Sequence, residues 1–254
     1  MANRTSIETR LHNLQELLAI QDEQALAEFQ ERLDMSWIFH DSSLEGTVLS
    51  FHELKSAIDK DVISDVSLIP TYDEIRAHKG AIDFVRDIAS QRKKVPVTVD
   101  LLLKIHQSLT PDEAEKKEDP WRKETPVHRL YFHDIPPPEK IAPEVKKLSD
   151  WLNAGDTRKM PALRFASKLH FRLMQIYPFA KNSGKVARLA MNLVLLRVGY
   201  PPAIVHATER QRYYESLRGP SKLLHALMID SLENSIESAI KLFTERESGR
   251  RALA

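Results

Sequence analysis

Apolar residues recur at spacings of three and four along most of this 254-residue chain, and that periodicity constrains its fold more than any other feature. Leu11, Leu14 and Leu18 begin the pattern, and residues 81–88 and 101–109 repeat it. This spacing places apolar side chains on one face of a helix. Only 7 glycines interrupt the chain. The sequence therefore predicts an all-α protein.

The boundaries of the predicted helices follow from capping and breaking residues. Thr98 lies three residues before Leu101 and suits the N-cap of a helix over 101–109. Residues 41–43, Asp-Ser-Ser, have the composition of a turn, and a new helix is predicted near Phe51. The C-terminal helices are expected to run to about Phe243, before a basic and frayed tail. The other predicted helices cover residues 145–152, 162–176 and 186–198.

The segment 111–138 breaks this helical pattern. It is polar and rich in proline, apart from residues 127–132, which have strand propensity. One short strand or hairpin cannot form the core of a sheet in a helical protein. We therefore expect a surface flap at 127–132, ended in extended conformation by the prolines at 136–138.

Composition excludes several classes of function. Basic and acidic residues nearly cancel, 37 against 36, so no strong overall field attracts nucleic acid or an anionic membrane. The absence of cysteine excludes disulfides, thiolate zinc sites and cysteine nucleophiles. Residues 1–18 lack the apolar core of a signal peptide, and the apolar stretch 186–198 is too short and too charged to span a bilayer. We expect a cytoplasmic protein without nucleic-acid or membrane partners; the sequence leaves its oligomeric state open.

The loop that precedes the most apolar helix carries residues suited to anions. The N-terminus of that helix presents unpaired N–H groups and the positive end of the helix dipole to the loop. Asn182 and Gly184 tolerate positive φ, and Lys181, Lys185 and Arg188 add positive charge. Two interpretations remain open, an anion or phosphate pocket and a plain capped loop with solvated lysines.

The same loop resembles the catalytic motif of the Fic (Fido) family, His-Pro-Phe-x-Asp/Glu-Gly-Asn-Gly-Arg-x-x-Arg. Pro178, Phe179, Gly184 and Arg188 match that motif in register. Further similarities extend over roughly residues 35–235. They comprise the flanking helices at 165–170 and 188–195, the turn at 199–202, the base-proximal segment 210–214, the target-docking flap at 127–132 and the inhibitory motif at 37–46.

This resemblance implies a fold and a division of the chain. The fold would be the Fic helical bundle with a small β-hairpin flap. Residues 1–100 would form an N-terminal helical region, with the inhibitory-motif-like segment at 41–46, and residues 101–254 the Fic core with the C-terminal helices. A protein target would dock on the 127–132 flap, and ATP or another nucleotide would be the ligand.

The motif departs from the family at the positions of the histidine and the acid, which carry the chemistry. In the family, the histidine accepts the proton of a target hydroxyl, and the acid holds Mg²⁺. Here Tyr177 occupies the histidine position, and a phenol with a pKa of about 10 is a poor base at neutral pH. Lys181 occupies the acid position, and an ammonium group cannot ligate a metal, so Mg²⁺ is not expected. Three roles remain open for Tyr177: a packed aromatic that closes the site, an acceptor of a modification, or an acid in other chemistry. Two remain open for Lys181: a cation that replaces part of the charge of the metal, or a solvated lysine.

Other motif positions keep features that would bind phosphate. Lys185 replaces the first arginine and keeps the charge without its planar, two-point grip. The residues that we assign to phosphate or nucleotide binding are Asn182, Ser183, Gly184, Lys185, Arg188, Tyr213 and Tyr214.

Residues outside the motif loop complete the candidate site. We expect Glu45, at the inhibitory position, to form an ion pair with Arg188. Asp41 stands where the inhibitory motif has serine or threonine and would act as a backbone cap. His133 is the first candidate for a substitute base, whereas His170 is predicted to be a packed core residue.

Three functions remain open on the sequence alone. The first is a Fic-fold protein that binds a nucleotide or related phosphate ligand, with altered or weak transferase chemistry. The second is a pseudoenzyme that serves as a binding or regulatory module. The third is a metal-independent enzyme of another reaction class that uses Tyr177 and Lys181.

Overall fold

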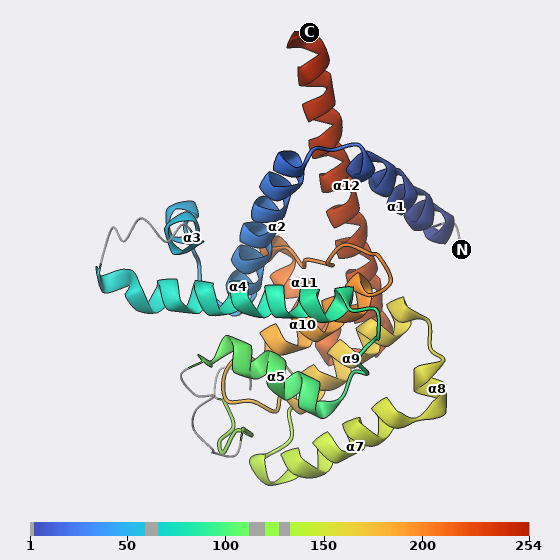
Figure 1. Ribbon diagram of the computed structural model, residues 1–254. Coiled ribbons are helices and arrows are strands. Elements are labelled where there is room, and N and C mark those ends of the chain that lie inside the picture. The colour runs from blue at the N-terminus through green and yellow to red at the C-terminus, as the bar shows by residue number, and fades with distance from the viewer. Residues whose placement is uncertain (1–2, 59–65, 112–119, 127–132, 254) are drawn as a thin grey trace.

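The computed structural model describes residues 3–58, 66–111, 120–126 and 133–253 (Figure 1). In these ranges every regular element is helical, and the one β-type pairing is an isolated antiparallel bridge between Trp121 and Phe179. The predicted all-α class is confirmed, whereas the predicted flap at 127–132 lies outside the described residues. The α-helices are α1 (Asn3–Ala19), α2 (Glu23–Leu44), α3 (Phe51–Ile58), α4 (Ile69–Ser90), α5 (Val99–Leu109), α7 (Ile141–Asn153), α8 (Gly155–Arg158), α9 (Ala162–Ile176), α10 (Ser183–Leu196), α11 (Arg210–Arg218) and α12 (Ser221–Leu253). Short 3-10 turns cover Val66–Leu68, Pro138–Lys140 and Ala207–Glu209.

Helix α10 lies at the centre of the molecule. Each of its residues from Ser183 to Leu195 is buried, because α9, α4 and α5 pack around it. This explains why its sequence is apolar on nearly every face. α4 crosses the middle of Figure 1 beside α10 and α5, and the first half of α10 meets the end of α2 through Arg188 and Glu45.

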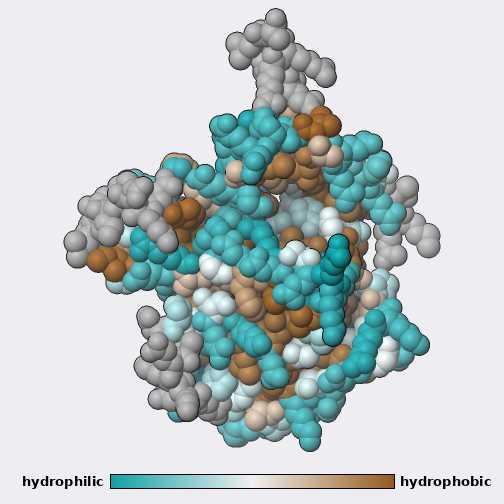
Figure 2. Space-filling view, in the orientation of Figure 1, coloured by the Kyte–Doolittle hydropathy of each residue, from teal (hydrophilic) through white to brown (hydrophobic). Residues whose placement is uncertain are grey.

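The first and last helices of the described chain pack against each other. α1 packs against α12, and the last part of α12 projects beyond the rest of the molecule in Figure 1. Hydrophilic residues cover most of the face in Figure 2, with hydrophobic surface between them in the middle of the molecule. No helix among the described residues is both long and apolar enough to cross a membrane.

Several helix boundaries agree with the sequence and others differ. Thr98 is the N-cap of α5, and its hydroxyl accepts the N–H of Leu101 at 3.2 Å, as predicted. The turn predicted at 41–43 is wrong, because these residues form the last turn of α2. Two of their polar side chains find partners there, so the helix continues: Asp41 pairs with Arg188, and the Ser43 hydroxyl donates to the carbonyl of Phe39 at 2.8 Å. The expected frayed tail after residue 243 is also wrong, since α12 extends to residue 253.

Candidate functional site

The loop between α9 and α10 is shaped by two residues with left-handed backbone. Tyr177 (φ 48°) and Asn182 (φ 64°) are the non-glycine residues with positive φ in the described parts of the chain. Tyr177 caps the end of α9, where its N–H donates to the carbonyl of Leu173 at 2.7 Å. Asn182 caps the start of α10, as its tolerance of this conformation predicted. Gly184 does not need its conformational freedom, because it lies within the helix.

Two hydrogen bonds of the Ser183 side chain connect the start of α10 to Phe179 in the loop. The Ser183 hydroxyl accepts the N–H of Phe179 at 2.8 Å and donates to the carbonyl of the same residue at 3.0 Å. The ring of Phe179 is buried and stacks on His106, with ring centroids 4.0 Å apart. Ser183 therefore stabilises the loop, and its assignment to phosphate binding stays a prediction.

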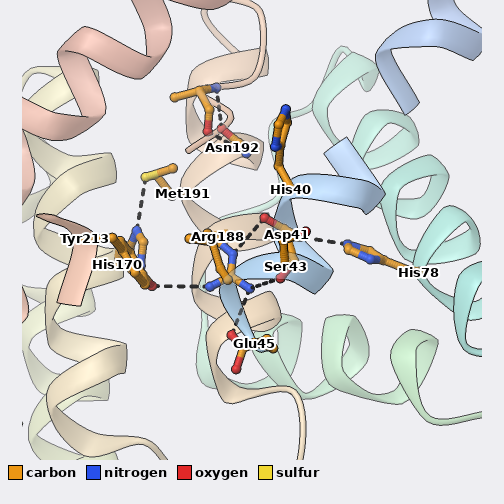
Figure 3. Close-up of polar contacts among 12 residues, drawn as sticks. His40, Asp41, Ser43, Glu45, His78, His170, Arg188, Met191, Asn192 and Tyr213 are labelled. Atoms are coloured by element: carbon orange, nitrogen blue, oxygen red, sulfur yellow. Dashed lines mark hydrogen bonds and ion pairs between the residues drawn. The ribbon is translucent and has the colours of Figure 1, made fainter. Parts of the chain in front are cut away.

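Arg188 is the centre of the polar network (Figure 3). Its guanidinium group is almost fully buried and forms ion pairs with Asp41, Nε to Oδ1 at 2.8 Å, and with Glu45, Nη2 to Oε1 at 2.9 Å. The Nη1 atom lies 3.3 Å from the hydroxyl of Tyr213. The predicted pair between Glu45 and Arg188 is confirmed. Two carboxylates beside one arginine outweigh the effect of burial, so the pKa of Arg188 is raised and its charge is permanent.

Glu45 brings its carboxylate to the N-terminus of α10. A Cβ atom added to Gly184 would lie 2.1 Å from Oε1 of Glu45 and 3.0 Å from Nη1 of Arg188. Any other residue at position 184 would therefore displace the carboxylate. An anionic group thus occupies the end of the helix where N–H groups and the helix dipole favour negative charge.

Asp41 and His78 belong to the network, although sequence reasoning did not place them there. Asp41 was predicted to cap a turn; instead its side chain is buried, with one oxygen on Arg188 and the other 3.4 Å from Nε2 of His78. Burial alone would raise the pKa of Asp41, but Arg188 and His78 lower it below its ordinary value. Burial lowers the pKa of His78, which is therefore neutral at pH 7. The four-residue spacing of Asp41 and Glu45 could have indicated that both carboxylates face Arg188, because residues four apart share one helix face.

The remaining candidate residues differ in exposure and in the direction of their polar groups. Lys181 is exposed on the loop, whereas Lys185 is buried on α10. The Tyr213 hydroxyl lies 2.9 Å from Nε2 of His170. The buried Tyr214 donates its hydroxyl to the carbonyl of Leu44 at 2.8 Å. The structure therefore directs both tyrosine hydroxyls into the protein, and their role in nucleotide binding stays a prediction.

Two histidines were given opposite roles from the sequence. His170 is fully buried, and burial lowers its pKa to about 3, which agrees with the predicted core position. His133 is also buried, and its Nε2 lies 2.7 Å from the carbonyl of Met174. That hydrogen bond fixes His133 against the end of α9, and its use as a base is untested.

The residues at the loop do not fit a magnesium ion held in the way that the Fic motif implies. The position of the acid is occupied by Lys181, which is exposed and offers no lone pair when protonated. The carboxylates of Asp41 and Glu45 are paired with Arg188. We therefore derive no chemical step through a metal.

The class of protein is defined by two features, the helical bundle and one ion pair. In that pair Glu45, at the end of α2, contacts the buried Arg188 in the central helix α10. Residues 96–195 match the sequence model of the Fic/DOC family, and the chain carries a Fic/DOC domain. Among curated proteins it is 27% identical over 180 residues to the protein adenylyltransferase Fic of Nematostella vectensis. That alignment covers 71% of this chain and 42% of the relative, so the chain spans less than half of its length.

Solved structures agree with this class at the level of fold. Fic-1 (residues 134–508) from Caenorhabditis elegans matches with a TM-score of 0.74 and 23% identity, over 94% of this chain and 71% of the other. A Fic domain containing signaling protein from Bacteroides thetaiotaomicron matches with a TM-score of 0.73 and 20% identity, over 92% and 96% of the two chains.

Proposed function

We propose that this Fic-domain protein binds a nucleotide or related phosphate ligand at the N-terminus of α10, with altered or weak transferase chemistry. The observation that carries the proposal is the position of the Glu45 carboxylate. It lies against Gly184 and 2.9 Å from Arg188, so this end of the helix already accommodates an anionic group. An external phosphate would bind by displacing that carboxylate.

Ordinary histidine- and magnesium-dependent AMP transfer is not part of the proposal. The ring at the position of the motif histidine belongs to Tyr177, which is 2% exposed. A buried phenol accepts a proton poorly near pH 7, and loss of general-base help typically lowers a rate by about 10²- to 10⁴-fold. Lys181 would supply positive charge in place of a metal. A substitute role for His133 as the base belongs to the same proposal.

A protein target and a cytoplasmic location complete the proposal. The curated relatives are named protein adenylyltransferases, and one solved Fic structure, IbpAFic2, is covalently tethered to Cdc42. We propose that a protein target docks on the segment 127–132. The division of the chain near residue 100 is likewise proposed, and the family match begins at residue 96.

The second candidate is a pseudoenzyme that acts as a binding or regulatory module. Two observations favour it: Tyr177 is packed in the interior, and Arg188 is held by two carboxylates. In this reading, the buried network stabilises the fold, and the surface of the molecule carries the function.

Binding and AMP transfer measured side by side separate these functions. Calorimetric titrations would use inorganic phosphate, AMP, ADP and ATP, each in EDTA and then in Mg²⁺, with wild type and Glu45→Gly. We expect metal-free binding that tightens by about tenfold in Glu45→Gly, because the internal carboxylate no longer competes. Lys181→Asp should weaken that binding in EDTA. Glu139→Gly, which removes an exposed glutamate, is the matched control and should not change the affinities.

The same preparations would be incubated with labelled ATP and Mg²⁺. We expect no transfer of AMP to the protein or to a lysate above background. Strong labelling that disappears in Tyr177→Phe would refute the proposal and make the tyrosine catalytic. If no phosphate compound binds to any variant, the pseudoenzyme becomes the better description.

A further inference from the structure

The two carboxylates on Arg188 are held with very different firmness. The Asp41 side chain is 2% exposed, contacts Nε at 2.8 Å, and its backbone carbonyl lies 3.4 Å from Nη2. The Glu45 side chain is 20% exposed and pairs with Nη2 at 2.9 Å, at the end of α2. Glu45 is therefore the partner that a ligand can replace, and Asp41 stays in place.

The charge that Arg188 itself offers after Glu45 leaves is small. Arg188 still has the negative charge of Asp41 at 2.8 Å. His78, on the other side of Asp41, is buried and neutral, so it adds no positive charge that would compensate the carboxylate. Tyr213 contacts Arg188 through a hydroxyl. With Asp41 in place, Arg188 thus offers charge for one negative group of similar size at the position that Glu45 vacates, while Lys181 and Lys185 lie on the loop and the helix beside it.

We propose that Asp41 sets the ligand class of this site, which takes a single phosphate group, as in a nucleoside monophosphate or free phosphate, and disfavours a triphosphate. This inference rests on the proposed binding function. A triphosphate would bring several negative charges near a buried carboxylate that cannot move away. Repulsion between like charges is stronger in the interior than in water, because the effective dielectric constant is lower.

The test compares phosphate chains of different length in variants with and without Asp41. Calorimetric titrations in EDTA would measure phosphate, AMP and ATP against Glu45→Gly and against Glu45→Gly/Asp41→Asn. With Asp41 present, we expect AMP to bind at least as tightly as ATP. Removal of the Asp41 charge should improve ATP relative to AMP by about tenfold or more, which is a difference of about 1.4 kcal/mol. Asp156→Asn in the Glu45→Gly background removes an exposed carboxylate and should leave the ratio unchanged.

Each outcome decides a separate point. If Glu45→Gly with Asp41 intact prefers ATP to AMP by tenfold, the inference is wrong, while the proposed binding function stands. If no phosphate compound binds to either variant, the binding function itself fails, and the inference fails with it. AMP and phosphate of equal affinity would indicate that free phosphate suffices, whereas tighter AMP would indicate a nucleotide; both results support a single-phosphate site. Because Asp41→Asn leaves a buried arginine uncompensated, its folding would be checked by circular dichroism, and the Glu45→Gly arm alone can refute the inference.

Discussion

Gly184 controls what lies at the N-terminus of α10 by the absence of a side chain. The residue is helical, so its backbone conformation would suit any amino acid. The available space is the constraint, since a Cβ atom would lie 2.1 Å from Oε1 of Glu45. That oxygen is the end of a flexible side chain that is partly exposed, and it can therefore move. Arg188 would then keep Asp41 as its remaining carboxylate partner.

Gly184→Ala should break the pair between Glu45 and Arg188 without changing either residue. Alanine gains up to about 1 kcal/mol of helix propensity over glycine, and this gain offsets the lost contact. In a Glu45→Gly background only the gain remains, so a double-mutant cycle should give a coupling of roughly 0.5–1.5 kcal/mol. Chemical denaturation measures the four free energies of unfolding. Gly80→Ala, at a helical glycine with open space around its Cβ position, should stabilise both backgrounds equally. A coupling of zero at position 184 would show that Glu45 does not lie against the helix.

At the scale of elements, one arginine ties the chain around Glu124 and at Pro136 to the motif loop. The buried side chain of Arg122 donates from Nε to the carbonyl of Tyr177 at 2.8 Å, from Nη1 to that of Glu124 at 3.0 Å, and from Nη2 to that of Pro136. Its backbone N–H donates to the carbonyl of Pro178 at 2.9 Å. Carbonyl groups at a helix end need hydrogen-bond donors, and Arg122 donates to the carbonyl of Tyr177 at the end of α9. The chain on both sides of residues 127–132 is thereby fixed to the loop.

Arg122→Lys should loosen this connection. Lysine has one ammonium group and cannot reach three carbonyls in a plane, so we expect the free energy of unfolding to fall by about 2–3 kcal/mol. Denaturation by urea gives that change, and hydrogen exchange of the residue 122 amide should accelerate. Arg158→Lys, at an exposed arginine bonded to Asn153, is the matched control and should change stability little. Equal stability of Arg122→Lys and Arg158→Lys would contradict the role of Arg122 as a clamp.

The sequence predicted the positions of helices better than it predicted the contacts that the helix ends make. Periodicity and capping found α5 and α9 with their boundaries, because these signals are local. The end of α2 was missed, since aspartate and serine disfavour helix interiors unless tertiary partners engage them, as Arg188 engages Asp41. The pair of Glu45 with Arg188 followed from the family resemblance. The clamp by Arg122 had no local signal, because its partners are backbone carbonyls up to 55 residues away.

At the scale of the whole molecule, buried and half-buried histidines connect the helices of the core in their neutral form. His170 on α9 has its pKa lowered to about 3 by burial, and then by the charge of Arg188. His40 on α2 has its pKa lowered to about 4, again mainly by burial and next by His206, whose ring stacks on it with centroids 4.3 Å apart. Burial also lowers the pKa of His78 on α4. Protonation of any of these would place an extra positive charge beside the network of Arg188 or its neighbours.

These lowered pKa values predict that the fold loses stability in mild acid. Between the folded pKa and the unfolded value of about 6.5, the unfolded chain binds more protons, so the free energy of unfolding falls as the pH falls below 6.5. His170 alone should remove roughly 2 kcal/mol between pH 7 and pH 5, because each pH unit below the unfolded pKa is worth about 1.4 kcal/mol. Urea denaturation at pH 7.5, 6 and 5 measures this slope. His170→Gln can keep a hydrogen bond to Tyr213 and should reduce the slope of the free energy of unfolding against pH by the equivalent of about one proton. His12→Gln, at an exposed position, should leave the slope unchanged. If His170→Gln keeps the full slope, or if wild type is more stable at pH 5 than at pH 7.5, the core histidines are not held neutral by the fold.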